Sequence, residues 1–305
     1  MCQSRWHWAA APRLSAADRR QTHGRLAAFW KEAYENDRET PLRVSVVIEL
    51  EACRRHARQA ADNSLLYWGT LTLASFQYGQ AEWWSALALL DEAPESQRDV
   101  EYLTLRGQIE ESLGNWQASR SLAKEALPMQ QQIGDRAGEA ATWHRLATID
   151  LREGDYDAAR EKLQKSLPMQ QQIGDRAGEA ATWHQLATID VHEGNYDAAR
   201  EKFQKSLPIK QQIGDRAGEA ATFFQLGMLA KEMGNVPGSV KLVGLCLVLD
   251  QAIGHGDTRS DLRTFRQQCA HLEYSEQQIQ QLLQEIGASY QQDRGEALIK
   301  EAFAD

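Results

Sequence analysis

Two stretches of the chain are nearly the same: WHRLATIDLREGDYDAAREKLQKS at residues 143–166 and WHQLATIDVHEGNYDAAREKFQKS at residues 183–206. They belong to longer copies, residues 127–166 and 167–206, which are identical at 35 of 40 positions. A third copy begins at Leu207 and keeps the register through QQIGDRAGEAAT before it diverges. Such a period indicates a protein built from stacked repeats, each of which is one supersecondary element.

Each copy is predicted to form two helices. Apolar residues recur from Trp143 at the spacing of one helix face, and Gly154 is expected to end that helix as a left-handed C-cap. The second helix is expected to begin near Tyr156. It contains Pro168, where we expect a kink rather than an early end, because the following MQQQI again favours helix. Asp135 is the expected N-cap of the first helix.

This pattern resembles the tetratricopeptide repeat, in its longer bacterial form of about 40 residues. The resemblance rests on a spacing that recurs in register: Trp143, Leu146, Ala147, Gly154, Tyr156, Ala159 and Leu163. It implies an all-α fold, a right-handed α-solenoid of antiparallel helix pairs with helical caps. Three positions depart from the family: Ala147 replaces a usual glycine, Asp150 a usual aromatic residue and Ser166 a usual alanine. Near-identical arrays of this kind are similar to the sensor arrays of STAND signalling ATPases.

The pattern along the chain predicts five regions. They are a disordered N-terminus at 1–12, N-terminal helices at 13–62, a degenerate repeat-like unit at 63–95, an array of about four units at 96–256, and C-terminal capping helices at 257–305. The N-terminal helices are expected at Ala16 to Asn36 and Leu42 to Ala61, with a turn at DRETP between them. One capping helix is predicted from an apolar stripe, Leu262, Phe265, Cys269 and Leu272. A capping box at Ser275 to Gln278 predicts the start of another.

Composition favours an ordered protein and disfavours nucleic-acid and membrane partners. Charged residues make up 25% of the chain and hydrophobic residues 42%, as in ordered domains. The net charge is −9 without a cluster of lysine and arginine, whereas binding to nucleic acid or to an anionic membrane needs one. The longest apolar run, residues 242–249, is far shorter than the roughly 20 residues that span a bilayer, and no signal peptide is expected. Four cysteines without CxxC spacing favour a reducing, cytoplasmic location.

The resemblance also implies where a partner binds. In this family the first helix of each repeat lines a concave groove with the face that points away from the second helix. Carried over by position, the expected groove residues are His144, Arg145, Thr148, Leu151, Arg152, His184, Gln185, Thr188, Val191, His192, Phe224, Gln225, Met228, Lys231 and Glu232. Three of the five differences between the two near-identical copies lie on this face, at Arg145/Gln185, Leu151/Val191 and Arg152/His192. Either the groove has been diversified on a fixed scaffold, or these changes fell there by chance.

The sequence contains no phosphate-binding loop GxxxxGK[ST], and no GxGxxG, HExxH or GxSxG motif. We therefore expect no enzymatic activity, no cofactor and no metal site. His144 and His184 belong to successive repeats, whose packed helices are roughly 10 Å apart, too far to share an ion with bonds of about 2 Å.

Three functions remain open. The first is a noncatalytic scaffold or sensor that binds a protein or peptide and acts with a STAND-type ATPase or another effector, as a fragment, a split component or a stand-alone adaptor. The second is a peptide-responsive regulator of an enzyme, with the helices at residues 16–61 as the effector part. The third is RNA binding by a helical repeat, which the acidic charge disfavours.

Overall fold

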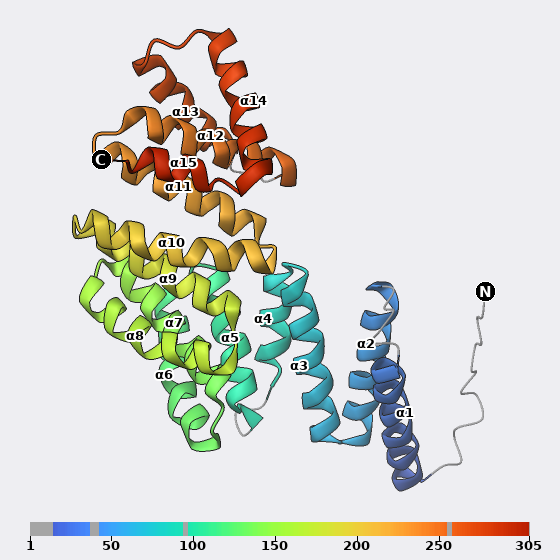
Figure 1. The fold of residues 1–305 in the computed structure, drawn as a ribbon. Helices are drawn as coiled ribbons and strands as arrows, with labels where there is room; N and C mark the ends of the chain where they lie inside the picture. Colours follow the sequence, from blue (N-terminus) through green and yellow to red (C-terminus); the bar gives the residue numbers. More distant parts are fainter. Residues whose placement is uncertain (1–14, 37–42, 94–96, 255–257, 305) are drawn as a thin grey trace. The chain divides into compact units, whose positions relative to one another are not determined.

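The computed structural model describes residues 15–36, 43–93, 97–254 and 258–304, which are helical and contain no strand. The expected disordered N-terminus at 1–12 and the DRETP turn lie outside these residues. The chain forms two compact parts, an N-terminal part at residues 1–133 and a C-terminal part at residues 134–305 (Figure 1).

The N-terminal part contains six helices in its described residues. They are α1 (Ala16–Asn36), α2 (Arg43–Ala60), α3 (Asn63–Gly79), α4 (Trp83–Asp91), α5 (Val100–Ser112) and α6 (Trp116–Ile133). Each helix packs against the next one along the chain. Leu73, Ala74, Ala86 and Leu90 are fully buried between them, so the apolar pattern of the degenerate unit does form a core.

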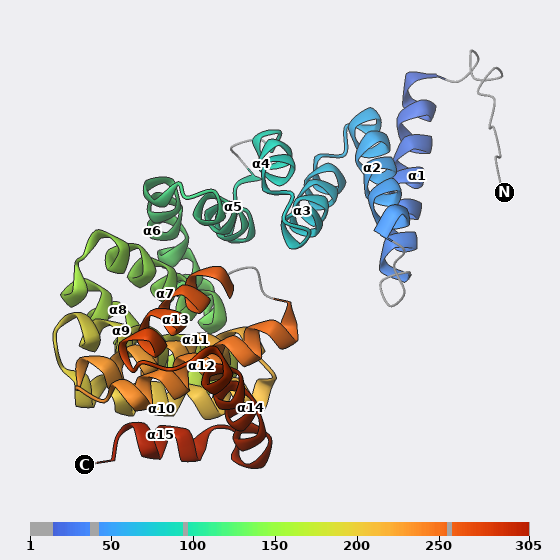
Figure 2. The same ribbon diagram turned by 90° about the horizontal axis from the view of Figure 1, so that it is seen from above.

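The C-terminal part carries the clearest repeats. Its described helices are α7 (Arg136–Glu153), α8 (Tyr156–Ile173), α9 (Arg176–His192), α10 (Tyr196–Ile213), α11 (Arg216–Glu232), α12 (Val236–Ile253), α13 (Thr258–His271), α14 (Glu276–Asp293) and α15 (Glu296–Ala302). Helices α7/α8, α9/α10 and α11/α12 form three pairs, and the second helix of each pair also packs against the next first helix. This succession is the packing of an α-solenoid (Figures 1 and 2).

The helix ends follow the sequence prediction. Gly154 ends α7 with a φ of 79°, and the Asp135 carboxylate accepts the Gly138 N–H at 2.9 Å as an N-cap. Pro168 lies inside α8, which continues to Ile173 as expected. The capping box at the start of α14 is also present. Because caps depend on local backbone chemistry, they could be predicted without tertiary information.

The aspartates that replace a usual aromatic residue are buried and ion-paired. Asp190 is 2% exposed, and its Oδ1 accepts a hydrogen bond from Arg160 of the preceding pair at 2.8 Å. Its other oxygen pairs with Lys202 on the partner helix α10. In the first pair Asp150 is paired in the same way with Lys162. The repeat therefore accommodates a polar residue in its core by supplying a cation from the facing helix.

The third pair lacks both members of this ion pair. Ala230 and Leu242 stand at the positions of Asp190 and Lys202, and both are fully buried. The aspartate and the lysine have therefore been replaced together, which keeps the core free of an unpaired charge.

Helix α12 differs from α8 and α10 because helices α13, α14 and α15 pack against it (Figure 2). Leu245 stands where the earlier copies have Lys165 and Lys205. A side chain at Gly244 would meet the Ile286 side chain at 2.8 Å. The divergence of the third copy is thus explained by the helices that cover it.

Most of the apolar stripe predicted on α13 is buried in the structure. Phe265 and Cys269 are fully buried, and Leu272 packs beside them. Leu262, the first residue of this stripe, is 37% exposed, so the stripe is buried only from Phe265 onward. Helix α12 is long and apolar enough by composition to cross a membrane, the one such helix among the described residues, but most of it is buried in the core of this part.

Candidate functional site

The middle of the expected groove face joins successive helices. His144 Nδ1 on α7 lies 3.0 Å from Thr182 Oγ1 on α9. One turn further on, the Gln185 amide donates to Thr148 Oγ1 at 2.8 Å. These four side chains are therefore occupied in holding α7 against α9.

His184 holds the equivalent position on α9 and has a similar role. Its Nδ1 lies 3.2 Å from Lys210 Nζ on α10 and 3.4 Å from Thr222 Oγ1 on α11. Its ring packs edge-on against Phe203, with the ring centroids 5.0 Å apart. The Thr188 hydroxyl donates to the His184 carbonyl oxygen at 3.0 Å. This cluster connects three helices and leaves the imidazole largely enclosed.

Burial also determines the charge of these two histidines. It lowers the pKa of His144 to about 4, with nearby Asp175 opposing the shift and Arg145 adding to it. Burial and then the Lys210 ammonium lower the pKa of His184 to about 3. Both imidazoles are neutral near neutral pH, so neither supplies a positive charge to a partner.

The same pKa values predict that the fold is sensitive to acid. The unfolded chain binds protons at these histidines near pH 6.5, and the folded chain only near pH 4 and below, so stability falls as the pH drops from about 6.5 to about 4. Urea midpoints measured at several pH values test this. Replacing His144 and His184 together by glutamine is expected to reduce the slope. An unaltered slope in the double variant would contradict the assignment.

Several further members of the predicted face are also covered. Three apolar ones pack against core clusters: Leu151, Val191 and Phe224. Met228 Sδ lies 3.9 Å from the Gln268 amide nitrogen on α13, and Gln225 is half-buried. Arg145 is only 5% exposed, so its guanidinium is not offered to solvent.

Four of the predicted residues are exposed, at the C-terminal ends of the first helices: Arg152, His192, Lys231 and Glu232. We refer to these four residues as the exposed row. Arg152, His192 and Glu232 hold equivalent positions, 40 residues apart. The His192 ring stacks on Tyr156 of α8, with centroids 4.9 Å apart and ring planes 14° apart. At these three equivalent positions, the side chain therefore changes from a cation to an imidazole to a carboxylate along successive helix pairs.

The sequence prediction overlooked a polar position on the second helices. Gln170 Oε1 on α8 accepts the Thr182 hydroxyl at 2.8 Å. Lys210 holds the equivalent position on α10 and donates to Thr222 Oγ1 at 2.9 Å. The signal was present in the sequence, as the difference between Gln170 and Lys210 at equivalent positions of two successive copies.

Comparison with known protein families decides the identity of the repeats. The tetratricopeptide-repeat family model matches residues 100–172 and 178–238. Over these residues, the chain is built of tetratricopeptide repeats. Its all-α solenoid fold, predicted from the repeat spacing, is thereby confirmed. No curated protein matches the sequence.

Several solved structures resemble most of the chain in fold. A STAND protein with a tetratricopeptide-repeat sensor from Pyrococcus horikoshii is 15% identical, with a TM-score of 0.65 over 92% of this chain. The match covers 45% of the STAND protein, so this chain spans less than half of its length. The apo form of RapI is 11% identical, with a TM-score of 0.61 over 81% of this chain and 98% of RapI. Aspartyl phosphate phosphatase F from Bacillus subtilis is 12% identical, with a TM-score of 0.56 over 86% of this chain and 71% of the phosphatase. At these identities the likeness shows the fold.

Proposed function

We propose that this tetratricopeptide-repeat protein is a noncatalytic scaffold or sensor that binds a protein or peptide through the exposed row. The observation that carries the proposal is that the row is exposed to solvent and changes its charge from one helix pair to the next. Residues 127–166 and 167–206 keep 35 of 40 positions, yet Arg152 is replaced by His192 at the C-terminal end of the first helix. Solvated positions are free to change without loss of packing, so they can determine which partner is bound.

The charges of the row define the kind of partner. Successive first helices are roughly 10 Å apart, which an extended peptide covers in about three residues. Arg152 favours an acidic side chain, and Glu232 favours a basic one about six residues away. We therefore propose an extended segment with an acidic group near one end and a basic group near the other.

Charge reversal in the row tests the proposal. A partner is first identified by mass spectrometry of what co-purifies with the full chain, and its affinity is then measured by calorimetry. Arg152→Glu and Glu232→Lys are each expected to weaken binding by about tenfold or more. The matched control is Glu201→Lys, which makes the same charge change as Glu232→Lys at an exposed site on α10. The control is expected to alter the affinity by less than about twofold. Equal affinity in the control and both row variants would rule out the row as the binding site.

We further propose that the chain acts as the sensor of a cytoplasmic signalling system. The fold likeness to the STAND sensor supports this role, and a phosphate-loop ATPase encoded beside the gene would support it further. The free, buried Cys53, Cys246 and Cys269 are compatible with a reducing location. The likeness to RapI and to aspartyl phosphate phosphatase F supports the alternative, a peptide-responsive regulator of an enzyme that acts through α1 and α2. Inactivity in a phosphatase assay would disfavour that alternative.

A further inference from the structure

The polar position on the second helices holds a different residue in each of the three pairs. It is Gln170 in α8, Lys210 in α10 and Asp250 in α12, each 40 residues after the last. In the first two pairs, an amide and an ammonium group contact the threonines Thr182 and Thr222 of the next first helix. The third pair places a carboxylate where its neighbours have a neutral group and a cation.

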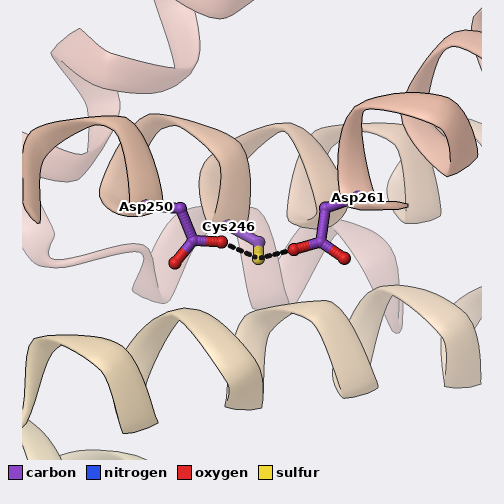
Figure 3. A group of neighbouring side chains, drawn as sticks. All are labelled: Cys246, Asp250 and Asp261. Atoms are coloured by element: carbon purple, nitrogen blue, oxygen red, sulfur yellow. Dashed lines mark hydrogen bonds between the residues drawn. The ribbon is translucent and has the colours of Figure 1, made fainter. Parts of the chain in front are cut away.

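A thiol and a second carboxylate surround Asp250. Cys246 lies one turn earlier on α12, and Asp261 comes from the beginning of α13. Cys246 Sγ is 3.4 Å from Asp250 Oδ2 and 3.8 Å from Asp261 Oδ2. Figure 3 shows both carboxylates pointing at the sulfur from opposite sides. Cys246 is 2% exposed and Asp250 4%, whereas Asp261 is half-buried.

The buried Asp250 carboxylate is paired with a thiol and not with a cation. A thiol carries one proton, so it cannot donate to both carboxylates at once. Within the described part of the chain, the Asp250 carboxylate has no partner besides this thiol. Two carboxylates that meet in a buried site repel each other unless a proton or a cation lies between them. In the second pair Lys210 supplies a positive charge at this position, and the third pair has no such residue.

Both sulfur-to-oxygen separations suit ligands of one metal ion. Tetrahedral zinc has Zn–S bonds of about 2.3 Å and Zn–O bonds of about 2.0–2.2 Å, which place sulfur and oxygen ligands roughly 3.5 Å apart. The observed separations of 3.4 and 3.8 Å lie close to this value, and all three ligand atoms are within 4.8 Å of one another.

We propose that Cys246, Asp250 and Asp261 bind one zinc ion, with water as the fourth ligand on the half-buried side at Asp261. A thiolate ligand favours zinc over magnesium or calcium, which prefer oxygen ligands. Binding releases the thiol proton to solvent, so the affinity rises with pH. The ion joins α12 to the first capping helix α13 and thereby stabilises the end of the repeat array.

Cobalt(II) is a spectroscopic probe for this site. Adding Co²⁺ to the metal-free full chain is expected to produce a thiolate-to-cobalt absorption band in the near ultraviolet, which one equivalent of Zn²⁺ abolishes. Zn²⁺ alone is expected to raise the thermal unfolding midpoint. A wild-type chain without the band, or without a zinc-dependent shift of the midpoint, would overturn the proposal.

Two variants take their residues from the sister copies, so we expect both to keep the fold. Cys246→Ser introduces serine, which stands at the equivalent position 206. Asp250→Gln introduces glutamine, which stands at the equivalent position 170. Cys246→Ser is expected to abolish the cobalt band and weaken zinc binding by at least about tenfold. Asp250→Gln is expected to stabilise the metal-free chain, because it removes the repulsion between carboxylates. It is also expected to abolish the rise of the thermal unfolding midpoint that zinc causes.

The matched control is Cys269→Ala. This substitution removes another buried thiol of the C-terminal part, and the cobalt band is expected to persist. Circular dichroism confirms that each variant is folded. A band that persists in Cys246→Ser would show that a different thiol binds the metal and would overturn the assignment.

Discussion

Replacing Asp190 by alanine is expected to lower the free energy of unfolding by about 2–3 kcal/mol. The carboxylate is 2% exposed and accepts a hydrogen bond from Arg160 at 2.8 Å, while its second oxygen pairs with Lys202. Without it, the Lys202 ammonium is left in a largely enclosed site without its counter-charge. Urea unfolding followed by circular dichroism measures the change.

The third helix pair supplies the control for this prediction. The double variant Asp190→Ala with Lys202→Leu reproduces Ala230 and Leu242, and it is expected to regain stability to within about 1 kcal/mol of the wild type. Arg160 keeps a partner in both variants, because it also donates to Glu193 at 2.7 Å. If the double variant is as unstable as Asp190→Ala alone, the lost ion pair is not the cause.

Replacing Lys210 by glutamine is expected to raise the free energy of unfolding by about 1–3 kcal/mol at pH 7. Lys210 is 6% exposed. Burial lowers its pKa from 10.5 to about 8, and the opposing attraction of Asp215 does not cancel the shift. At pH 7 the folded protein therefore holds a charged ammonium in an environment that favours the neutral amine. Glutamine removes the charge and, as Gln170 shows, can still contact the threonine of the next helix.

The pH dependence distinguishes this cause from a simple packing effect. The folded pKa lies below the unfolded one, so the penalty is complete below pH 8 and disappears as the pH rises towards 10.5. The advantage of Lys210→Gln is therefore expected to shrink across this window. The reciprocal variant Gln170→Lys is expected to lose about as much stability as Lys210→Gln gains. An advantage of Lys210→Gln that is constant from pH 7 to 10 would refute the electrostatic explanation.

The sequence predicted the fold well because its signals are local and repeated. Gly154 and Asp135 mark helix ends through their own backbone chemistry, and the 40-residue period identifies which helices pair. Even the departure at Asp150 has a local explanation, since Lys162 follows twelve residues later on the facing helix.

The candidate site was harder to predict because burial between repeats is not encoded in periodicity. The spacing places His144 and Arg145 on the face that turns away from the second helix, but the next repeat encloses part of that face. The cluster of Cys246 and Asp261 is even less accessible to pattern analysis. Its members lie on two helices, and α13 does not follow the 40-residue register, so no spacing motif identifies them.

The apolar surface of α12 determines how the protein can change in length. A copy of residues 167–206 inserted between Ser206 and Leu207 would have repeat-type neighbours on both sides, because α10 and α11 already pack against each other in that way. The same insertion after α12 would separate Leu245 and Gly244 from the helices that cover them. Duplication can therefore lengthen the array from its interior, whereas an insertion after α12 would break the contacts between the final pair and the helices that cover it.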